Sequence, residues 1–171
     1  VREAEDGPAF CQRVFDETGF TIRVLNGEEE ARYATQGVVS GAPLSKGIVA
    51  DLGGASLELM PIKGGVKGIT LPLGPFALSG GKAFDADKLR SRIAKTLDTV
   101  AADYRADDLN AVGGAWRSLA QMHMAMDGHP LTIVHQYSLS ADEARELART
   151  VIQQPRSVLE KQHGIAKRRA E

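Results

Sequence analysis

The chain has 171 residues, of which 43% are apolar and 25% charged, as in an ordinary globular protein. Its formal net charge is −1, so the charge balance gives no indication of a nucleic-acid or membrane-surface partner. No apolar run approaches the roughly 20 residues that a membrane-spanning helix needs, and no signal peptide is visible. Cys11 is the single cysteine, so an internal disulfide is impossible and a reducing, cytoplasmic compartment is expected.

The first part of the chain predicts two helices with a strand between them. A helix is expected over Pro8–Thr18, and the alternation of apolar and polar residues over Phe20–Leu25 predicts a strand. Asn26 then caps a second helix that is expected to run to about Val39. Glu29 stands three residues after this cap, which is the spacing of a capping box.

Three consecutive glutamates, Glu28, Glu29 and Glu30, crowd the first turn of this second helix. The helix dipole favours negative charge at that end, which is a sufficient structural explanation for most of the triplet. Successive side chains on a helix point about 100° apart, so at most one of the three can face a given site. The turn-rich segment 40–46 (SGAPLSK) indicates a domain boundary.

The stretch GIVADLGGASLELMPI, residues 47–62, predicts a strand, a glycine turn and a returning strand. Glycine tolerates positive φ and leaves no Cβ in the way of a ligand, and backbone N–H groups at such a turn bind phosphate. Asp51 and Glu58 flank the turn, and proteins usually hold Mg²⁺ through one or two carboxylates beside a phosphate. A tight hairpin with two solvated acids explains the same residues, and both interpretations stay open.

The remaining sequence predicts further strands and helices. A third strand is expected over Val66–Leu71, then a long helix from Asp85 to about Arg105. A short buried strand over Leu109–Val112 precedes a glycine pair and a helix over Ala115–Met126. Such a pair between strand and helix is where open α/β sheets bind phosphate, although a tight turn is the simpler explanation for the pair alone.

The chain ends with an extended segment expected over Leu131–His135 and a helix capped by Ser140 with Glu143 in a second capping box. Three antiparallel strands followed by helix and strand alternation predict a ribonuclease H-like α/β fold, with a mixed sheet flanked by helices. The glycine turn leads into a strand and lacks a following lysine, which excludes a P-loop and a Rossmann turn. No histidine spacing indicates a zinc site.

Three motifs then follow one another in a specific order: GEEEAR at 27–32, DLGGASLEL at 51–59 and AVGGAWRSLA at 111–120. With VREAED at the start and KRRAE at the end, they resemble the exopolyphosphatase / guanosine pentaphosphate phosphatase (Ppx/GppA) family over the whole chain. That family shares the actin, Hsp70 and sugar-kinase fold, with the active site between two ribonuclease H-like domains. The resemblance implies that residues 1–40, with the acidic crossing helix, end a truncated first domain. Residues 41–171 would form a second domain truncated at its C-terminus.

The resemblance also implies an activity, the removal of terminal phosphate from inorganic polyphosphate or guanosine pentaphosphate with Mg²⁺ as cofactor. Glu30 would be the general base that activates water, Glu58 would help to place the metal or the water, and Asp51 would hold the metal. No covalent enzyme intermediate is implied. The phosphate ligands would come from the two glycine motifs: Gly53, Gly54, Ala55, Ser56, Gly113 and Gly114.

Three alanines depart from the family pattern: Ala55 replaces a hairpin glycine, Ala77 an arginine and Ala115 a threonine. A positive φ at Ala55 would cost about 1 kcal/mol. These changes motivate one alternative, a phosphate-binding module without turnover; a second alternative is an actin-fold ATPase or sugar kinase, against which GEEEAR argues. The 171-residue chain alone is expected to show little hydrolysis, and a homodimer is one expected assembly because the fold often dimerises.

Overall fold

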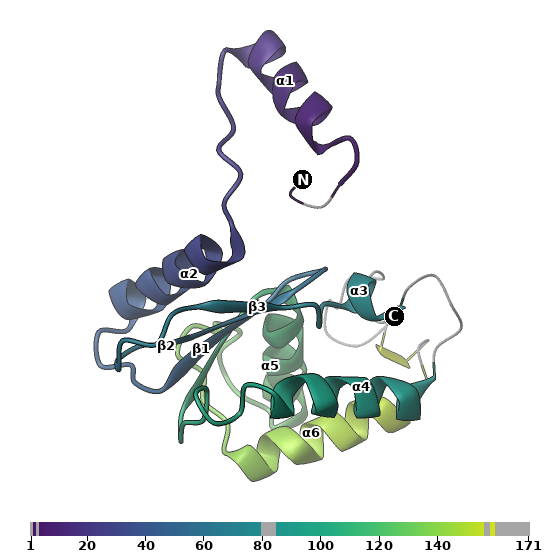
Figure 1. The fold of residues 1–171 in the computed structure, drawn as a ribbon. Helices are drawn as coiled ribbons and strands as arrows, with labels where there is room; N and C mark the ends of the chain where they lie inside the picture. Colours follow the sequence, from purple (N-terminus) through teal and green to yellow (C-terminus); the bar gives the residue numbers. More distant parts are fainter. Residues whose placement is uncertain (1, 3, 80–84, 156–157, 160–171) are drawn as a thin grey trace.

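The structure, a computed structural model, describes residues 2, 4–79, 85–155 and 158–159. A sheet with helices on both sides forms the body, and the first helix stands away from it on an extended arm (Figure 1). None of the described helices is long and apolar enough to cross a membrane. The elements in chain order are α1 (Gly7–Thr18), α2 (Gly27–Gly41), β1 (Ile48–Leu52), β2 (Leu57–Pro61), β3 (Ile69–Leu71), α3 (Pro75–Ser79), α4 (Ala86–Asp98), β4 (Leu109–Val112), α5 (Gly114–Met126) and α6 (Ala141–Gln153).

The four described strands form one sheet in the order β3-β2-β1-β4. β1 and β2 are antiparallel, as are β2 and β3, whereas β4 runs parallel to β1. The predicted mixed sheet beginning with three antiparallel strands is therefore confirmed. The register pairs Asp51 with Glu58 and Glu58 with Thr70, so these three side chains share one face of the sheet.

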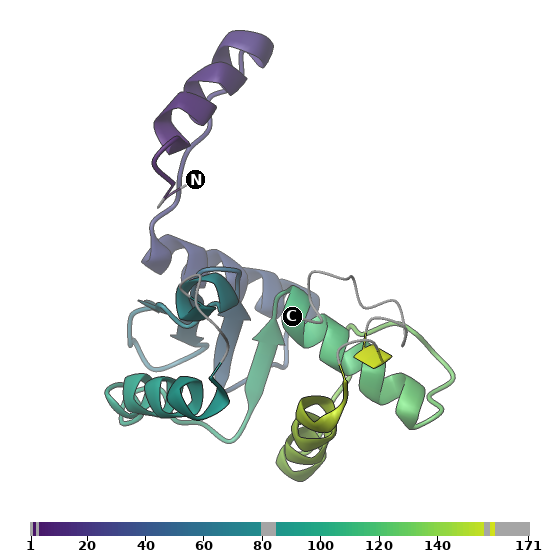
Figure 2. The same ribbon diagram turned by 90° about the vertical axis from the view of Figure 1, so that its right-hand side faces the viewer.

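The two faces of the sheet are covered by different helices, α2 on one side and α4 on the other (Figures 1 and 2). On the α4 side, Ile48, Ala50 and Leu59 form a buried cluster against which Ile93 and Leu97 pack. Because side chains alternate between faces along a strand, the residues that neighbour Ala50 and Leu59 on their strands face α2. Asp51 and Glu58 therefore point toward the helix that carries the three glutamates.

Both predicted capping boxes are confirmed. The Asn26 side chain accepts from the Glu29 N–H at 2.9 Å, and the Glu29 carboxylate accepts from the Asn26 N–H at 3.0 Å. Ser140 and Glu143 make the same reciprocal pair at the start of α6. These side chains satisfy amide groups that the first turn of a helix leaves without a partner, which is why the sequence located both helix starts correctly.

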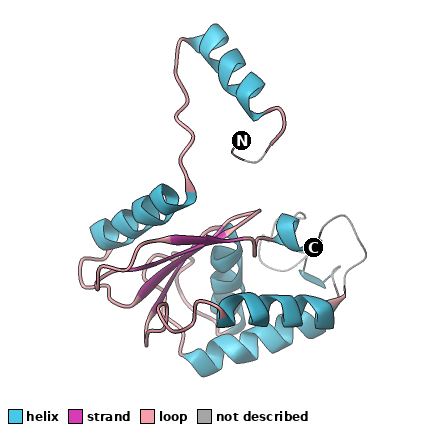
Figure 3. Cartoon of the chain, in the orientation of Figure 1, coloured by secondary structure: helices cyan, strands magenta, loops and turns pink. Residues whose placement is uncertain are grey.

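The strand predicted over Phe20–Leu25 is wrong, because residues 19–26 carry no regular structure and form the arm between α1 and α2 (Figure 3). Phe20 is 75% exposed and Val24 is 44% exposed. A strand exists only when its backbone groups bond to a neighbouring strand, and alternation in the sequence cannot supply that neighbour. For the same reason the extended segment expected over Leu131–His135 is irregular, with exposed Leu131 and Ile133.

Two further predicted elements are shorter than expected. The strand predicted over Val66–Leu71 pairs only as β3, because the residues before Ile69 form the loop that joins it to β2. The helix predicted to reach Arg105 ends at Asp98, although Val100 and Tyr104 still pack against the core cluster on that face. Tight turns with bonds between residues three apart continue the apolar spacing without continuing the α-helix.

The division into domains at residue 40 stays a prediction. α2 packs against β1, β2 and β3, while α1 and the arm extend away from the sheet in both views (Figures 1 and 2). The acidic helix thus links the arm to the body.

A second buried cluster joins α5 to α6, and its packing can be tested by a substitution at Met122 on α5. Met122 is fully buried at 0% exposure against Leu147 and Leu159, so Met122→Ala is expected to lower the free energy of unfolding by about 2–5 kcal/mol. Met126→Ala, on the same helix but at a side chain 51% exposed, is the control and is expected to change it by less than about 0.5 kcal/mol. Urea denaturation measures both, and equal losses would contradict the assignment of Met122 to the core.

Candidate functional site

The site is organised around Glu58, whose side chain is 1% exposed at the start of β2. Its Oε1 accepts a hydrogen bond from the Thr70 hydroxyl on β3 at 2.7 Å. Asp51 lies directly across the β1–β2 ladder from Glu58. The sheet thus holds two predicted carboxylates side by side, and one of them is removed from solvent.

Arg2 connects the sheet to the acidic helix. Its Nη1 donates to Glu30 Oε2 at 3.0 Å and to the Leu25 carbonyl oxygen at 3.2 Å. Its Nη2 lies 3.8 Å from Glu58 Oε1. One guanidinium therefore contacts both predicted catalytic glutamates, and these two carboxylates, carried by α2 and β2, face a common space. The predicted residues Glu30 and Glu58 are brought together.

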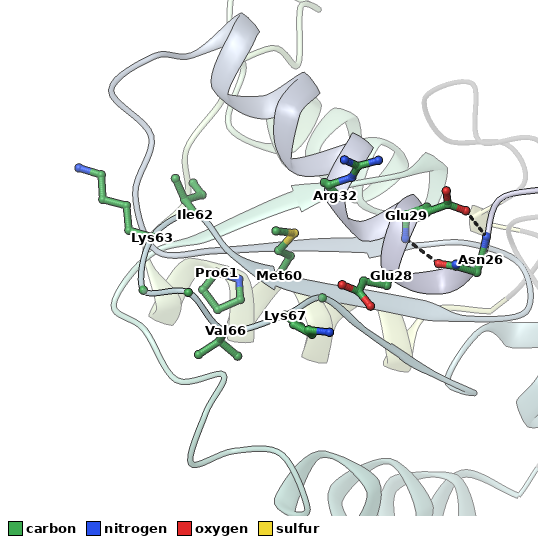
Figure 4. A pocket seen from close by; sticks show the side chains of 13 residues that line it. Asn26, Glu28, Glu29, Arg32, Met60, Pro61, Ile62, Lys63, Val66 and Lys67 are labelled. Carbon is green, nitrogen blue, oxygen red and sulfur yellow. Dashed lines mark hydrogen bonds between the residues drawn. The ribbon is translucent and has the colours of Figure 1, made fainter.

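The other two glutamates of the triplet are turned elsewhere. Glu29 serves the capping box and forms an ion pair with Arg23. Glu28 faces a separate cavity of about 570 Å³ between the first turn of α2 and the loop that joins β2 to β3, where Lys67 also lies (Figure 4). None of the predicted site residues lines this cavity. The expectation that only one glutamate of the three can face the site agrees with this geometry.

Asp51 is electrostatically coupled to both glutamates. Burial raises the pKa of the Asp51 carboxyl above its ordinary value, and the negative charges of Glu58 and then Glu30 raise it further. Three like charges converge here, and Arg2 is the cation that the structure places among them. Such a cluster favours the binding of a cation, because a positive ion removes the repulsion that raises this pKa.

The donor set fits Mg²⁺ better than a metal held by protein ligands alone. Among the described residues, no group of three or more histidines, cysteines, aspartates or glutamates is arranged to hold a metal. Mg²⁺ is usually bound through one or two carboxylates, with water and phosphate oxygens completing its octahedron. Asp51 and Glu58 match that requirement as an adjacent pair.

The hairpin tip is arranged differently from the expectation. The Gly53 N–H donates to the Ser56 carbonyl oxygen at 2.9 Å, so this amide is occupied within the turn, and its role as a phosphate ligand stays a prediction. The carbonyl oxygens of Gly54 and Ala55 accept from Phe76 and Gly74 at 2.8 and 3.1 Å. These bonds tie the tip to the segment before α3, and they leave Gly54 and Ala55 at the surface.

Backbone conformation does not require glycine at the hairpin tip, and close packing bears on Gly54 alone, since a Cβ on Gly53 would make only an ordinary contact at 3.6 Å. None of Gly53, Gly54 and Ala55 is among the described residues with positive φ, so Ala55 carries no strain of that kind. A Cβ at position 54 would lie 2.7 Å from Cε2 of Phe76, so the ring of this exposed side chain would have to move to admit one. The expected strain at Ala55 is therefore absent, and the motif's glycine at 54 is explained by its aromatic neighbour.

The second glycine pair lies beside one of these carboxylates, Asp51. Gly113 has a φ of +113° and forms the N-terminal cap of α5, so glycine is needed there for its backbone conformation. A Cβ on Gly113 would lie 2.5 Å from the Leu52 carbonyl oxygen and 3.2 Å from Asp51 Oδ1. The first turn of α5, which begins at Gly114, therefore lies beside Asp51. The positive end of a helix dipole beside Asp51 is suited to bind a phosphate group.

Two residues of the site, Arg2 and Thr70, were not predicted from the sequence. Arg2 belongs to a short basic and acidic stretch before α1, and its distance along the chain from Glu58 gave no reason to join them. Thr70 is an ordinary strand residue whose polar side chain could equally have faced solvent. The signal for Thr70 was its place on the alternating face of β3, which becomes informative only once the register with Glu58 is known.

Comparison with known proteins places these features in a family context. The sequence model of the Ppx/GppA phosphatase family matches residues 1–171 of this chain. The structure is similar to that of an exopolyphosphatase from Cytophaga hutchinsonii, with a TM-score of 0.85 and 18% identity over 99% of this chain and 59% of that chain. It is also similar to the Ppx/GppA family member of Aquifex aeolicus, with a TM-score of 0.75 and 24% identity over 99% of this chain and 58% of that one.

The expected ribonuclease H-like, actin-related fold is confirmed by these likenesses. The chain spans less than two thirds of the length of both solved structures.

The coupling of Asp51 to its neighbours makes a prediction about stability. A raised pKa means that the folded protein ionises Asp51 less readily than the unfolded chain, so stability is lost as pH rises from the ordinary aspartate pKa through the raised one. Asp51→Asn is expected to raise the melting temperature at pH 7 by a few degrees, and to lose this advantage below the ordinary aspartate pKa. Thermal denaturation across pH measures it, with Asp107→Asn in an exposed loop as the control. A variant less stable than the parent at pH 7 would contradict the coupling.

Proposed function

Because the chain belongs to the Ppx/GppA phosphatase family, we propose that it carries one wall of the active site of a phosphoanhydride hydrolase. The proposed reaction removes the terminal phosphate from inorganic polyphosphate, and guanosine pentaphosphate is the second candidate substrate. The observation that carries this proposal is the convergence of Glu30 and Glu58 on Arg2, beside Asp51 and the start of α5. The residues proposed as general base and as metal ligands, and the helix end proposed to face phosphate, are thus close neighbours.

Glu30 is the proposed general base. Its side chain is 43% exposed, so water can reach it, while its carboxylate is held toward the buried Glu58 by the shared guanidinium. In the proposed step a water oxygen attacks the terminal phosphorus, its proton passes to Glu30, and the bond to the bridging oxygen breaks with the electron pair leaving on the shortened chain. The proposed step transfers the phosphoryl group directly to water and forms no covalent bond to the enzyme.

Asp51 and Glu58 would hold Mg²⁺, which when bound supplies positive charge to the phosphoryl group being transferred. The guanidinium of Arg2 presents a planar fork of donors that suits phosphate oxygens as well as carboxylates. The amides at the surface of the hairpin tip and the first turn of α5 are the proposed ligands for the remaining phosphate oxygens. The chain's part in the reaction is thus positioning and charge neutralisation.

The alternative of a phosphate-binding module without turnover loses one of its supports. Its motivation included strain at Ala55, and that residue has no positive φ. No feature of the described residues favours an ATPase or a sugar kinase over the hydrolase. Residues 1–40 are proposed to complete a first domain that supplies the opposite wall of the cleft, since α1 and the arm extend away from the sheet (Figure 1).

Replacement of the proposed base is the most direct test. In the full-length protein with polyphosphate and Mg²⁺, Glu30→Gln is expected to reduce kcat by about a hundredfold or more, because the amide cannot accept the proton of water. Glu28→Gln, two positions earlier on the same helix and directed to another cavity, is expected to retain activity. Phosphate release measures both. A wild-type protein that releases no phosphate from polyphosphate or guanosine pentaphosphate would overturn the proposed function.

The 171-residue chain alone is expected to hydrolyse these substrates at least about a hundredfold more slowly than the full-length protein. Positioning supplies much of the rate in phosphoryl transfer, and a single wall leaves the substrate chain and the water unoriented. Phosphate release at equal concentrations of the two proteins measures the difference. Comparable turnover by residues 1–171 would show that the site is complete without an opposite wall.

A further inference from the structure

We propose that Thr70 is a positioning residue for the phosphatase reaction: it orients the Glu58 carboxylate and sets its place relative to Glu30. The inference rests on the proposed function and adds to it a residue outside every motif that marked the site. It follows from two contacts of one side chain, one to Glu58 and the other to the first residue of α2.

The first contact restrains the carboxylate directly. The Thr70 hydroxyl donates to Glu58 Oε1 at 2.7 Å, and the side chain of Glu58 is only 1% exposed. The guanidinium of Arg2 is farther from the same oxygen, at 3.8 Å, which is an ion pair without a close hydrogen bond. A carboxylate removed from water needs hydrogen-bond donors, so the hydroxyl determines which way this oxygen points.

The second contact joins Thr70 to the helix of the proposed base. A Cβ built on Gly27 would overlap Oγ1 of Thr70, so the start of α2 packs directly onto the threonine side chain. Gly27 lies three residues before Glu30 and therefore on nearly the same side of the helix. Thr70 thus touches both the strand partner that carries Glu58 and the helix that carries Glu30.

The residue type suits this task. Threonine is branched at Cβ, which restricts its χ1 angle and gives its hydroxyl a stiff direction. Valine has almost the same shape without the donor, and serine has the donor without the branch. Reaction rates in well-oriented sites are sensitive to displacements of about 1 Å, so a carboxylate free to turn affects the chemical step more than the binding of substrate.

Substitution at Thr70 in the full-length protein tests the inference. Thr70→Val is expected to lower kcat on polyphosphate about ten- to a hundredfold while KM changes less than about threefold, since a hydrogen bond to a charged group is lost. Thr70→Ser is expected to recover kcat to within about threefold of the wild type. Thr35→Val is the control: Thr35 lies on α2, which covers this side of the sheet, but it is buried and donates to the Ala31 carbonyl within its own helix, whereas Thr70 is exposed.

A second variant acts from the other side of the contact. Gly27→Ala places a methyl group against the Thr70 hydroxyl and is expected to lower kcat in the same way, with little change in KM. Unchanged kcat in Thr70→Val, in an enzyme that is otherwise active, would overturn the inference and leave the proposed function intact. So would a loss that serine fails to recover.

The orientation of Glu58 can also be observed without activity. Crystal structures of the Thr70→Val and Thr70→Ser variants are expected to show the Glu58 carboxylate rotated in the first and unchanged in the second. An unmoved carboxylate in the valine variant would overturn the inference even in a protein without phosphatase activity. If the wild-type protein releases no phosphate but the carboxylate is rotated in the valine variant, the proposed function is rejected. Thr70 would then still orient Glu58, but not for catalysis of this reaction.

Discussion

The contact of one guanidinium with two carboxylates is the interaction on which the site depends. Arg2 lies before α1, Glu30 lies in the first turn of α2, and Glu58 belongs to β2. A buried carboxylate beside two others is unfavourable unless cations and donors surround it, because like charges in a poorly solvated place repel strongly. Arg2 and the Thr70 hydroxyl supply that environment, and Arg2 also ties the residues before α1 to α2 and β2.

The sheet register explains why these acids meet. Antiparallel pairing opposes Asp51 to Glu58 and Glu58 to Thr70, and a shift of one residue would turn all of them to the α4 side. That side is apolar, with Ile48, Ala50 and Leu59 at its centre, so hydrophobic burial holds the polar face in place. The function of the site therefore rests on a core on the other side of the sheet.

The two glycine motifs contribute through different physical constraints. Gly54 leaves room for the exposed Phe76 ring, which a Cβ would displace, whereas Gly113 is needed for its positive φ and for its close approach to the Leu52 carbonyl oxygen. The hairpin uses one of its own amides for its turn, at Gly53. In the proposed function, the phosphate ligands would therefore be the other residues of the tip and the start of α5, where the helix dipole favours an anion.

The sequence by itself determined the local features: both capping boxes, the strand before Gly113, and the hairpin with Asp51 and Glu58 beside its turn. Each depends on neighbours within a few residues, which periodicity and capping chemistry report. The choice of Glu30 among the three glutamates came from the resemblance to the family and not from a local pattern. Only the tertiary structure decided that Phe20–Leu25 has no strand partner, that the helix before Thr99 stops, and that Arg2 and Thr70 complete the site. Those facts depend on contacts between distant parts of the chain, and no local pattern encodes which distant groups will share a hydrogen bond or a charge.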